Sequence, residues 1–211
     1  PGRPVNTDPR LIVADIEAFR QEGAREVRVA EGPGHPRDTD AILYASGLGP
    51  LLETVGASYT DLNVDDWGEP DLPGNYTKQG RLPIAGTILG ADLVVSMPKL
   101  KTHHWAGLTA SMKNFFGIVP GAVYGWPKNE LHYVGIPKSI YELNRIFRRS
   151  FAIVDGIVGM EGNGPIQGTP KHAGVLVMGR DLPAVDATCC RIMGIDPGEI
   201  EYLDRKSTRL N

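Results

Sequence analysis

Segments rich in valine and isoleucine alternate along this sequence with segments that have the periodicity of amphipathic helices. The pattern predicts strands over residues 26–32, 57–63, 92–99, 151–160 and 174–181. It predicts helices over 8–23, 39–56, 83–91, 138–150 and 182–194, the second of them interrupted near 47–50. Several strands are apolar throughout, which is typical of a parallel sheet covered on both faces. We therefore predict an α/β fold with a mostly parallel sheet, helices on both faces and Rossmann-like layers.

The chain has 211 residues, which suits the single α/β domain that we expect over residues 1–203. Residues 64–82 and 117–137 are rich in Gly, Pro or polar side chains and are expected to be loops. The chain begins with Pro rather than Met, and residues 204–211, DRKSTRLN, match the in-frame translation of a common sequencing adapter. We therefore expect a fragment of a longer protein that ends in an artefactual tail.

Composition excludes several classes of protein. The formal net charge is -3, so the chain has no general attraction for nucleic acid or for an anionic membrane surface. No apolar run reaches the roughly 18 residues that a membrane span needs. Cys189 and Cys190 are adjacent and lack a metal-binding spacing, so we expect reduced core thiols and a cytoplasmic protein.

Ligands of α/β proteins bind beyond the carboxyl ends of the strands, and polar or glycine-rich segments follow the expected strands here. The segment 32–35, GPGH, follows the first strand and is either a ligand loop or a plain turn. The fingerprints of dinucleotide-binding loops, P-loops, nucleophile elbows and zinc proteases are absent from the sequence. The candidate site therefore rests on two other segments.

The first segment is 99–117, KLKTHHWAGLTASMKNFFG. Lys99 and Lys101 alternate, so on an extended strand they face one side, where they either bind an anion or form a solvated basic loop. His103 and His104 are neighbours, and at most one of them is expected in a site. Trp105 either stacks on a ligand or packs. Lys113 follows small residues and is either a nucleophile in a restricted pocket or a surface side chain.

The second segment is 155–168, DGIVGMEGNGPIQG. Asp155 ends a strand, and Glu161 and Asn163 lie in a glycine-rich loop, where oxygen atoms suit Mg²⁺ or Ca²⁺ or simply hold a structural turn. The spacing does not match a calcium-binding loop. Asp186 falls within the apolar pattern of a helix, and it is either a site residue or a buried structural anchor.

Three blocks of this sequence resemble the family known as domain of unknown function 362. They are ADLVVSMPKLKTHHWAGLTASMKNFFGIVPG, IVDGIVGMEGNGPIQGTP and DLPAVDATCCRIMGIDP, and the resemblance covers nearly the whole chain to Leu203. Some members of that family are fused to ferredoxin-like iron–sulfur modules. This chain lacks the cysteine set for such a cluster, so the resemblance implies at most a redox or ferredoxin-like partner.

A more distant resemblance is to the nickel-pincer lactate racemase family. It rests on His103, Ala106-Gly107, Thr109, Lys113 and the Pro120-Gly121 turn. In that family the lysine tethers a nickel cofactor, so the resemblance implies that Lys113 is a tether, His103 a proton-transfer residue and His132 a ligand or base. The family's Gly-Gly before the lysine is Ala110-Ser111 here, and the Pro-Gly turn is displaced, so a shared site location is the safer implication than the nickel cofactor itself.

We therefore expect an enzyme of unidentified reaction that binds a small anionic molecule. The candidate catalytic residues are His103, Lys113 and His132, with His103 as acid or base. The candidate cofactor-binding residues are Lys99, Lys101, Thr109, Asp155, Glu161 and Asn163. The alternative is a non-catalytic module that docks to an iron–sulfur or other redox partner, which predicts an exposed apolar patch.

Overall fold

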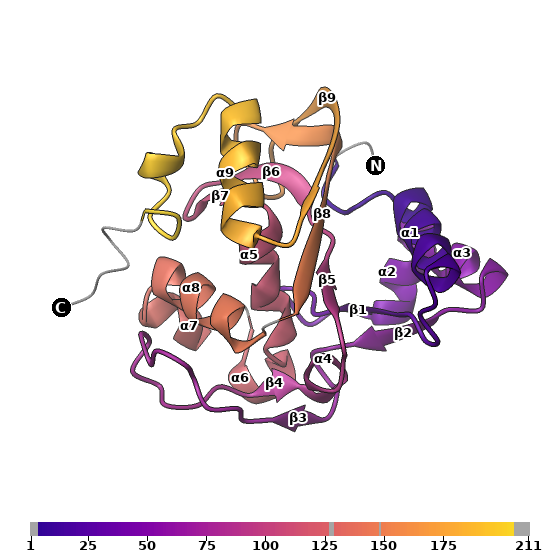
Figure 1. The fold of residues 1–211 in the computed structure, drawn as a ribbon, viewed down its shortest axis with the longest axis horizontal. Coiled ribbons are helices and arrows are strands. Elements are labelled where there is room, and N and C mark those ends of the chain that lie inside the picture. Colours follow the sequence, from indigo (N-terminus) through magenta and orange to yellow (C-terminus); the bar gives the residue numbers. More distant parts are fainter. Residues whose placement is uncertain (1–3, 127–128, 148, 205–211) are drawn as a thin grey trace.

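The computed structural model describes residues 4–126, 129–147 and 149–204. It has a mixed α/β fold in which the strands form three separate sheets (Figure 1). This confirms the predicted fold class, whereas a single layered sheet of the Rossmann type is not seen. Of the tail that matches an adapter, only Asp204 lies within the described residues.

The first unit contains α1 (Pro9–Gln21), β1 (Arg28–Glu31), α2 (Thr39–Ser46), α3 (Leu48–Thr54) and β2 (Ser58–Asp61). Strands β1 and β2 pair in parallel, as predicted. The interruption expected near 47–50 is Gly47, which separates α2 from α3 with a left-handed φ of 75°. The unit has a small apolar core of its own around Ile16, Leu48 and Leu52.

The expected loop 64–82 contains one short strand, β3 (Trp67–Gly68), which pairs antiparallel with β4 (Ile84–Ala85). Only one helical turn, α4 (Gly86–Leu89), forms where a longer helix was predicted over 83–91. The buried carboxylate of Glu142 accepts hydrogen bonds from the backbone N–H groups of Tyr76 and Thr77, at 2.9 and 2.8 Å. This long excursion is therefore anchored to the helix that carries Glu142.

The main sheet contains β5 (Val94–Ser96), β6 (Lys99–His103), β7 (Gly107–Thr109), β8 (Ser150–Glu161) and β9 (Thr169–Gly179). Strands β5 and β6 both pair in parallel with β8, whereas β7 pairs antiparallel with β6 and β9 antiparallel with β8. The sheet is thus mixed. The reason is local, because β9 follows β8 after only a short loop, and a parallel pair needs a crossover of a dozen or more residues.

The remaining helical elements are α5 (Ser111–Asn114), η1 (Phe115–Ile118), α6 (Gly121–Tyr124), α7 (Asn129–Tyr133), α8 (Ile136–Ile146), α9 (Leu182–Ile192) and η2 (Pro197–Glu199). The prediction of a loop over 117–137 was therefore wrong, because two short helices form there. Helix α9 lies against β8 and β9, and α5 and α8 pack together with η1 on the same large apolar core (Figure 1).

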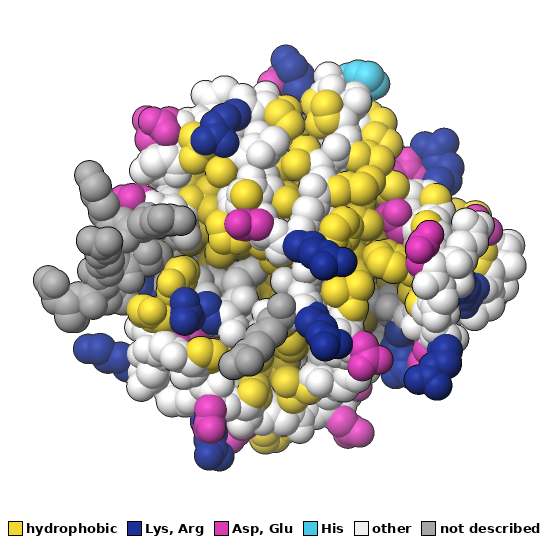
Figure 2. Space-filling view, in the orientation of Figure 1, with side chains coloured by type: hydrophobic (Ala, Val, Ile, Leu, Met, Phe, Trp, Pro, Cys, Tyr) yellow, Lys and Arg dark blue, Asp and Glu magenta, His cyan; other side chains and the backbone are white. Residues whose placement is uncertain are grey.

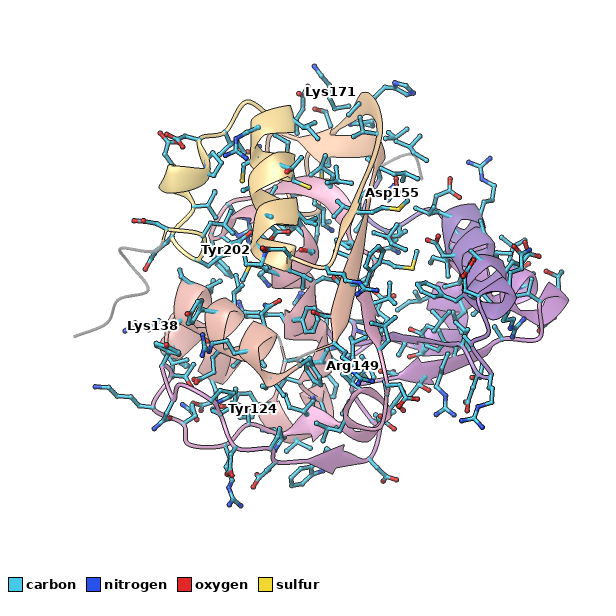
Figure 3. All side chains as sticks on the ribbon, in the orientation of Figure 1. Tyr124, Lys138, Arg149, Asp155, Lys171 and Tyr202 are labelled. Carbon is cyan, nitrogen blue, oxygen red and sulfur yellow. The ribbon has the colours of Figure 1, made fainter. Side chains whose placement is uncertain are left out.

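A buried ion pair of the main sheet shares its carboxylate with the first unit. The Nζ atom of Lys99 lies 2.5 Å from Oδ2 of Asp155, and the exposed fractions of the two side chains are 5% and 0%. The same Oδ2 accepts a hydrogen bond of 2.9 Å from the backbone N–H of Asp8, which is the N-cap of α1. Figure 3 shows Asp155 on the side of β8 that faces the first unit. One carboxylate therefore fixes the start of α1, β6 and β8 relative to each other.

We predict that Lys99→Met lowers the free energy of unfolding by about 3–5 kcal/mol, because it leaves the Asp155 carboxylate buried without its countercharge. Urea denaturation monitored by circular dichroism measures this change. Lys171→Met is the matched control, since Lys171 pairs with Glu161 at 3.5 Å on the surface and an exposed pair contributes less than about 1 kcal/mol. Equal losses in the two variants would contradict the role given to the buried pair.

Candidate functional site

Four of the predicted binding and catalytic side chains lie on one face of the β6–β7 hairpin. In the antiparallel register Lys101 is opposite Thr109 and His103 is opposite Gly107, so Lys101, His103 and Thr109 share a face. The β6–β8 register shifts between Lys99 and Lys101, but both lysines face the segment before α1, Lys101 through the Val5 carbonyl and Lys99 through the Asp155 carboxylate that also accepts the Asp8 N–H. Among the described residues, the buried Oγ1 atom of Thr109 has no hydrogen-bond partner. We call this surface, made by Lys99, Lys101, His103 and Thr109, the hairpin face.

Lys99 of the hairpin face and Asp155 of β8 form the buried ion pair described above. The Oδ1 atom of Asp155 accepts a further hydrogen bond of 3.1 Å from the backbone N–H of Ile157. The structure thus brings these two predicted residues together and gives them a structural role. Their part in binding a cofactor stays a prediction.

Lys101 is a half-buried cation of the hairpin face. Its Nζ donates a hydrogen bond of 2.9 Å to the backbone carbonyl oxygen of Val5, in the segment that leads into α1. Burial lowers the pKa of Lys101 to about 8, the positive charge of Lys99 lowers it further, and Glu31 at the end of β1 opposes both effects. The amine of Lys101 therefore changes its charge close to physiological pH.

His103 is held by the tight turn that follows it. Its Nδ1 atom accepts hydrogen bonds from the backbone N–H groups of Trp105 and Ala106, at 3.1 and 3.2 Å. Burial lowers the pKa of His103 to about 3, and positive charge on Lys113, His104, Lys101 and His132 adds to this effect. The ring is consequently uncharged at neutral pH, and both predicted catalytic partners, Lys113 and His132, act on it electrostatically.

Next to His103, imidazole and aromatic rings and a lysine side chain contact one another in series. The ring of His104 stacks on that of His103 at 5.1 Å, and the ring of Trp105 lies 4.6 Å from that of His104. The ring of His132, on α7, lies 5.5 Å from that of Trp105 and 5.9 Å from that of Phe116. The Nζ atom of Lys113 lies 3.6 Å from the centre of the Phe116 ring. The imidazole–aromatic cluster comprises His103, His104, Trp105, Lys113, Phe116 and His132, so it unites the three predicted catalytic residues.

Asp186 positions the short helix that carries Lys113. The carboxylate is fully buried and accepts hydrogen bonds from the backbone N–H groups of Ser111 and Met112, at 2.7 and 3.1 Å. It also accepts from the hydroxyl groups of Ser111 and Tyr202, at 2.5 and 3.4 Å. Burial raises the pKa of Asp186 to about 6, although these hydrogen bonds oppose the rise. Of the two roles that the sequence left open for Asp186, the contacts favour the structural anchor.

Glu161 and Asn163 take no part in the ring and cation contacts that make up the imidazole–aromatic cluster. Both are exposed at the end of the sheet, and Glu161 forms its surface ion pair with Lys171 of β9. The loop that follows them is nevertheless tied to the hairpin, because His104 contacts the carbonyl oxygen of Gly164 through its backbone N–H and through Nδ1. The proposed role of Glu161 and Asn163 in binding a cofactor stays a prediction.

Asn63, which the sequence analysis did not single out, joins the first unit to the edge of the site. Its buried Nδ2 donates to the carbonyl oxygen of Pro33 at 2.9 Å, and its Oδ1 accepts from the backbone N–H of Gly121 at 3.0 Å. The GPGH loop after β1 is therefore held against the segment that follows Phe116. A signal existed in the sequence, since Asn63 is the last residue of the strand expected over 57–63.

We looked for side chains that could bind a metal ion in the part of the chain that the structure describes. There, no three His, Cys, Asp or Glu side chains are grouped so that they could hold an ion. The imidazoles of His103 and His104 are instead engaged with backbone groups.

The fold and the site together define a mixed α/β protein with lysines and an uncharged imidazole on one face of a hairpin. The profile of the domain of unknown function DUF362 matches residues 1–191, and the chain belongs to that family. This confirms the resemblance noted in the sequence. A relative is the thylakoid-associated protein sll1697 of Synechocystis sp., which is 26% identical over 202 residues. The match covers 95% of this chain and 61% of that protein, so the chain spans less than two thirds of the relative's length.

The relative's name describes that protein as thylakoid-associated. Among residues 4–126, 129–147 and 149–204 of the present chain, no helix is both long enough and apolar enough to cross a membrane. The cytoplasmic location expected from the two reduced cysteines stays a prediction. Both thiols are free and buried.

We predict that Asp186 makes the free energy of unfolding fall as pH rises from about 4 to 6. The unfolded carboxyl loses its proton near its ordinary pKa of 3.8, whereas the native one retains it to about 6. The loss from this group is about 3 kcal/mol, complete above pH 6. Urea denaturation of wild type and Asp186→Asn at several pH values measures the difference between them, with the exposed Asp92→Asn as control. An equal slope in wild type and Asp186→Asn would contradict the assignment.

Proposed function

We propose that the hairpin face binds a small anionic molecule, as the substrate or cofactor of an enzyme. The observation that carries the proposal is the positive potential around the half-buried, uncharged imidazole of His103. Lys101 and Lys113 both act on His103 from different elements, β6 and α5. An oxyanion in this region would interact with both ammonium groups in a partly desolvated setting, where such interactions are stronger than in water.

Two further features support the same proposal. The partnerless hydroxyl of Thr109 lies on the hairpin face and offers a hydrogen bond to a bound group. Lys113 is held by an anchored helix, since Asp186 fixes both residues at the start of α5. A site built on rigid elements holds its ligand in a defined geometry, which is what catalysis requires. The roles of His132 and Lys113 in a reaction belong to this proposal.

A second candidate function is docking to an acidic redox partner, and an exposed apolar strip supports it. Ile157, Leu176 and Met178 are 41%, 40% and 50% exposed on β8 and β9, and Figure 2 shows apolar side chains gathered over these strands. In the described part of the chain, β9 pairs only with β8, so its outer edge is open. Lys171 and Arg149 lie toward opposite ends of the strip (Figure 3), and their charges would complement an acidic ferredoxin-like surface.

For the anion site, we predict that sulfate and oxalate bind and that Lys101→Met and Lys113→Met each weaken binding by roughly 10- to 100-fold. A hydrogen bond to a charged group contributes about 1.5–3 kcal/mol, and about 1.4 kcal/mol corresponds to tenfold in affinity. NMR titration of the labelled protein measures the dissociation constants. Lys171→Met, which removes the surface cation paired with Glu161, is the control and should leave them unchanged.

Binding of the same two anions should weaken as pH rises from 7 to 9. The sign follows from the pKa of Lys101, about 8, because the amine loses its charge over this range. Lys101→Met should remove this part of the pH dependence. Binding that is absent, or that is equally strong in all three lysine variants, would overturn the proposed anion site.

For the docking alternative, we predict that Met178→Asp weakens binding of an acidic [2Fe–2S] ferredoxin by at least about tenfold, because it places a charge in the apolar strip. The labelled chain is titrated with the ferredoxin and followed by NMR. Val64→Asp, at another exposed apolar position in the loop after β2, is the control. Unchanged affinity in Met178→Asp, or no binding by the wild type, would remove this alternative.

A further inference from the structure

His103 has one ring nitrogen occupied by the protein's own backbone. Its Nδ1 atom accepts hydrogen bonds from two N–H groups, those of Trp105 and Ala106, at 3.1 and 3.2 Å. A nitrogen that accepts an N–H group carries no proton of its own, so the neutral ring carries its proton on Nε2. The tautomer is thus set by the three-residue turn between β6 and β7.

We infer that His103 serves the site as an uncharged hydrogen-bond donor, which holds an oxygen atom of the ligand through Nε2–H, rather than as a proton acceptor. This inference rests on the proposed anion site and adds the class of ligand atom that the imidazole recognises. That atom is an oxygen with a lone pair, as in a carboxylate, sulfate or phosphate group. His103 is in this view a binding residue that can also stabilise negative charge developing on that oxygen.

Proton uptake by His103 is opposed from two directions. Protonation of Nδ1 would break both hydrogen bonds from the turn and leave two backbone N–H groups facing a third donor. The charged ring would also lie among Lys101 of β6, Lys113 of α5, His104 of the turn and His132 of α7, all of which disfavour positive charge there. A reaction at this site would therefore take its proton acceptor from another side chain, and Lys113 and His132 are the other two predicted catalytic residues.

The orientation of the ring is fixed by packing as well as by hydrogen bonds. The ring of His104 stacks on it with an interplanar angle of 26°, and the Nδ1 atom of His104 lies 2.9 Å from the carbonyl oxygen of Gly164. The loop after β8 therefore holds His104, and His104 holds one side of the His103 ring. A donor with a fixed direction needs no reorganisation when a ligand binds.

The first test is the state of the wild-type ring, and it needs neither a ligand nor a variant. Long-range ¹H–¹⁵N NMR of the ¹⁵N-labelled protein distinguishes the two neutral tautomers from the charged ring, and His103→Gln identifies the signals. We expect the Nε2–H tautomer, unchanged from pH 9 to pH 5. A proton on Nδ1, or a ring that becomes charged between pH 7 and pH 5, would overturn the inference.

The second test uses sulfate as the probe. Gln can present an N–H group in place of Nε2–H, whereas Phe cannot. We expect His103→Gln to retain sulfate affinity within about threefold and His103→Phe to lose about tenfold or more, at pH 6 and pH 7 alike. Equal losses in both variants would contradict the role of donor.

The two proposals fail in different ways. If wild type binds no sulfate, the anion site itself is wrong, and the donor role that rests on it falls with it. If sulfate binds through Lys101 and Lys113 while the spectrum shows a charged or Nδ1-protonated His103, only the donor role is wrong. Because the spectrum is recorded on wild type, this distinction does not depend on whether a variant folds.

Discussion

The arrangement of the whole molecule depends on the buried ion pair between Lys99 and Asp155. Asp155 lies in the middle of β8, the strand that pairs with β5, β6 and β9, and it also receives the N–H of Asp8 at the start of α1. The neighbouring Thr7 adds a hydrogen bond of 2.6 Å to the carbonyl oxygen of Met97. These contacts hold the first unit against the amino end of β6. Glu31 of β1 can therefore act on Lys101, although the two residues belong to different sheets.

Asp155, Glu142 and Asp186 share one structural principle. Each is a fully buried carboxylate that accepts backbone N–H groups from a segment distant in sequence. Burying a carboxylate is costly, and these hydrogen bonds offset that cost only where the segments adopt their native positions. The three carboxylates therefore specify which segments meet. At Asp186 the hydrogen bonds offset only part of the cost of burying the carboxylate, so its pKa is raised. This residue supports the helix that carries Lys113.

Local patterns predicted the elements of this fold better than their connections. The amphipathic periods and capping residues predicted α1, α8 and α9 within a few residues. The antiparallel direction of β9 was missed because a run of apolar residues does not encode strand direction. The structural role of Lys99 was not visible either. Its ion-pair partner, Asp155, is 56 residues away in the sequence, and Asp8, whose N–H binds the same carboxylate, is 147 residues from Asp155. Electrostatic partners at such separations become known only with the fold.

The turn between β6 and β7 couples the composition of the hairpin face to the state of His103. Residues 104–106 set the register in which Lys101 is opposite Thr109, and a slip by one residue would move Thr109 to the opposite face. Gly107 ends the turn with a φ of 73°, a left-handed backbone conformation that favours glycine. The same turn supplies the two N–H groups that occupy Nδ1 of His103. The set of side chains on the hairpin face and the proton position on its imidazole therefore have one common cause, and a change in the length of this turn would alter both together.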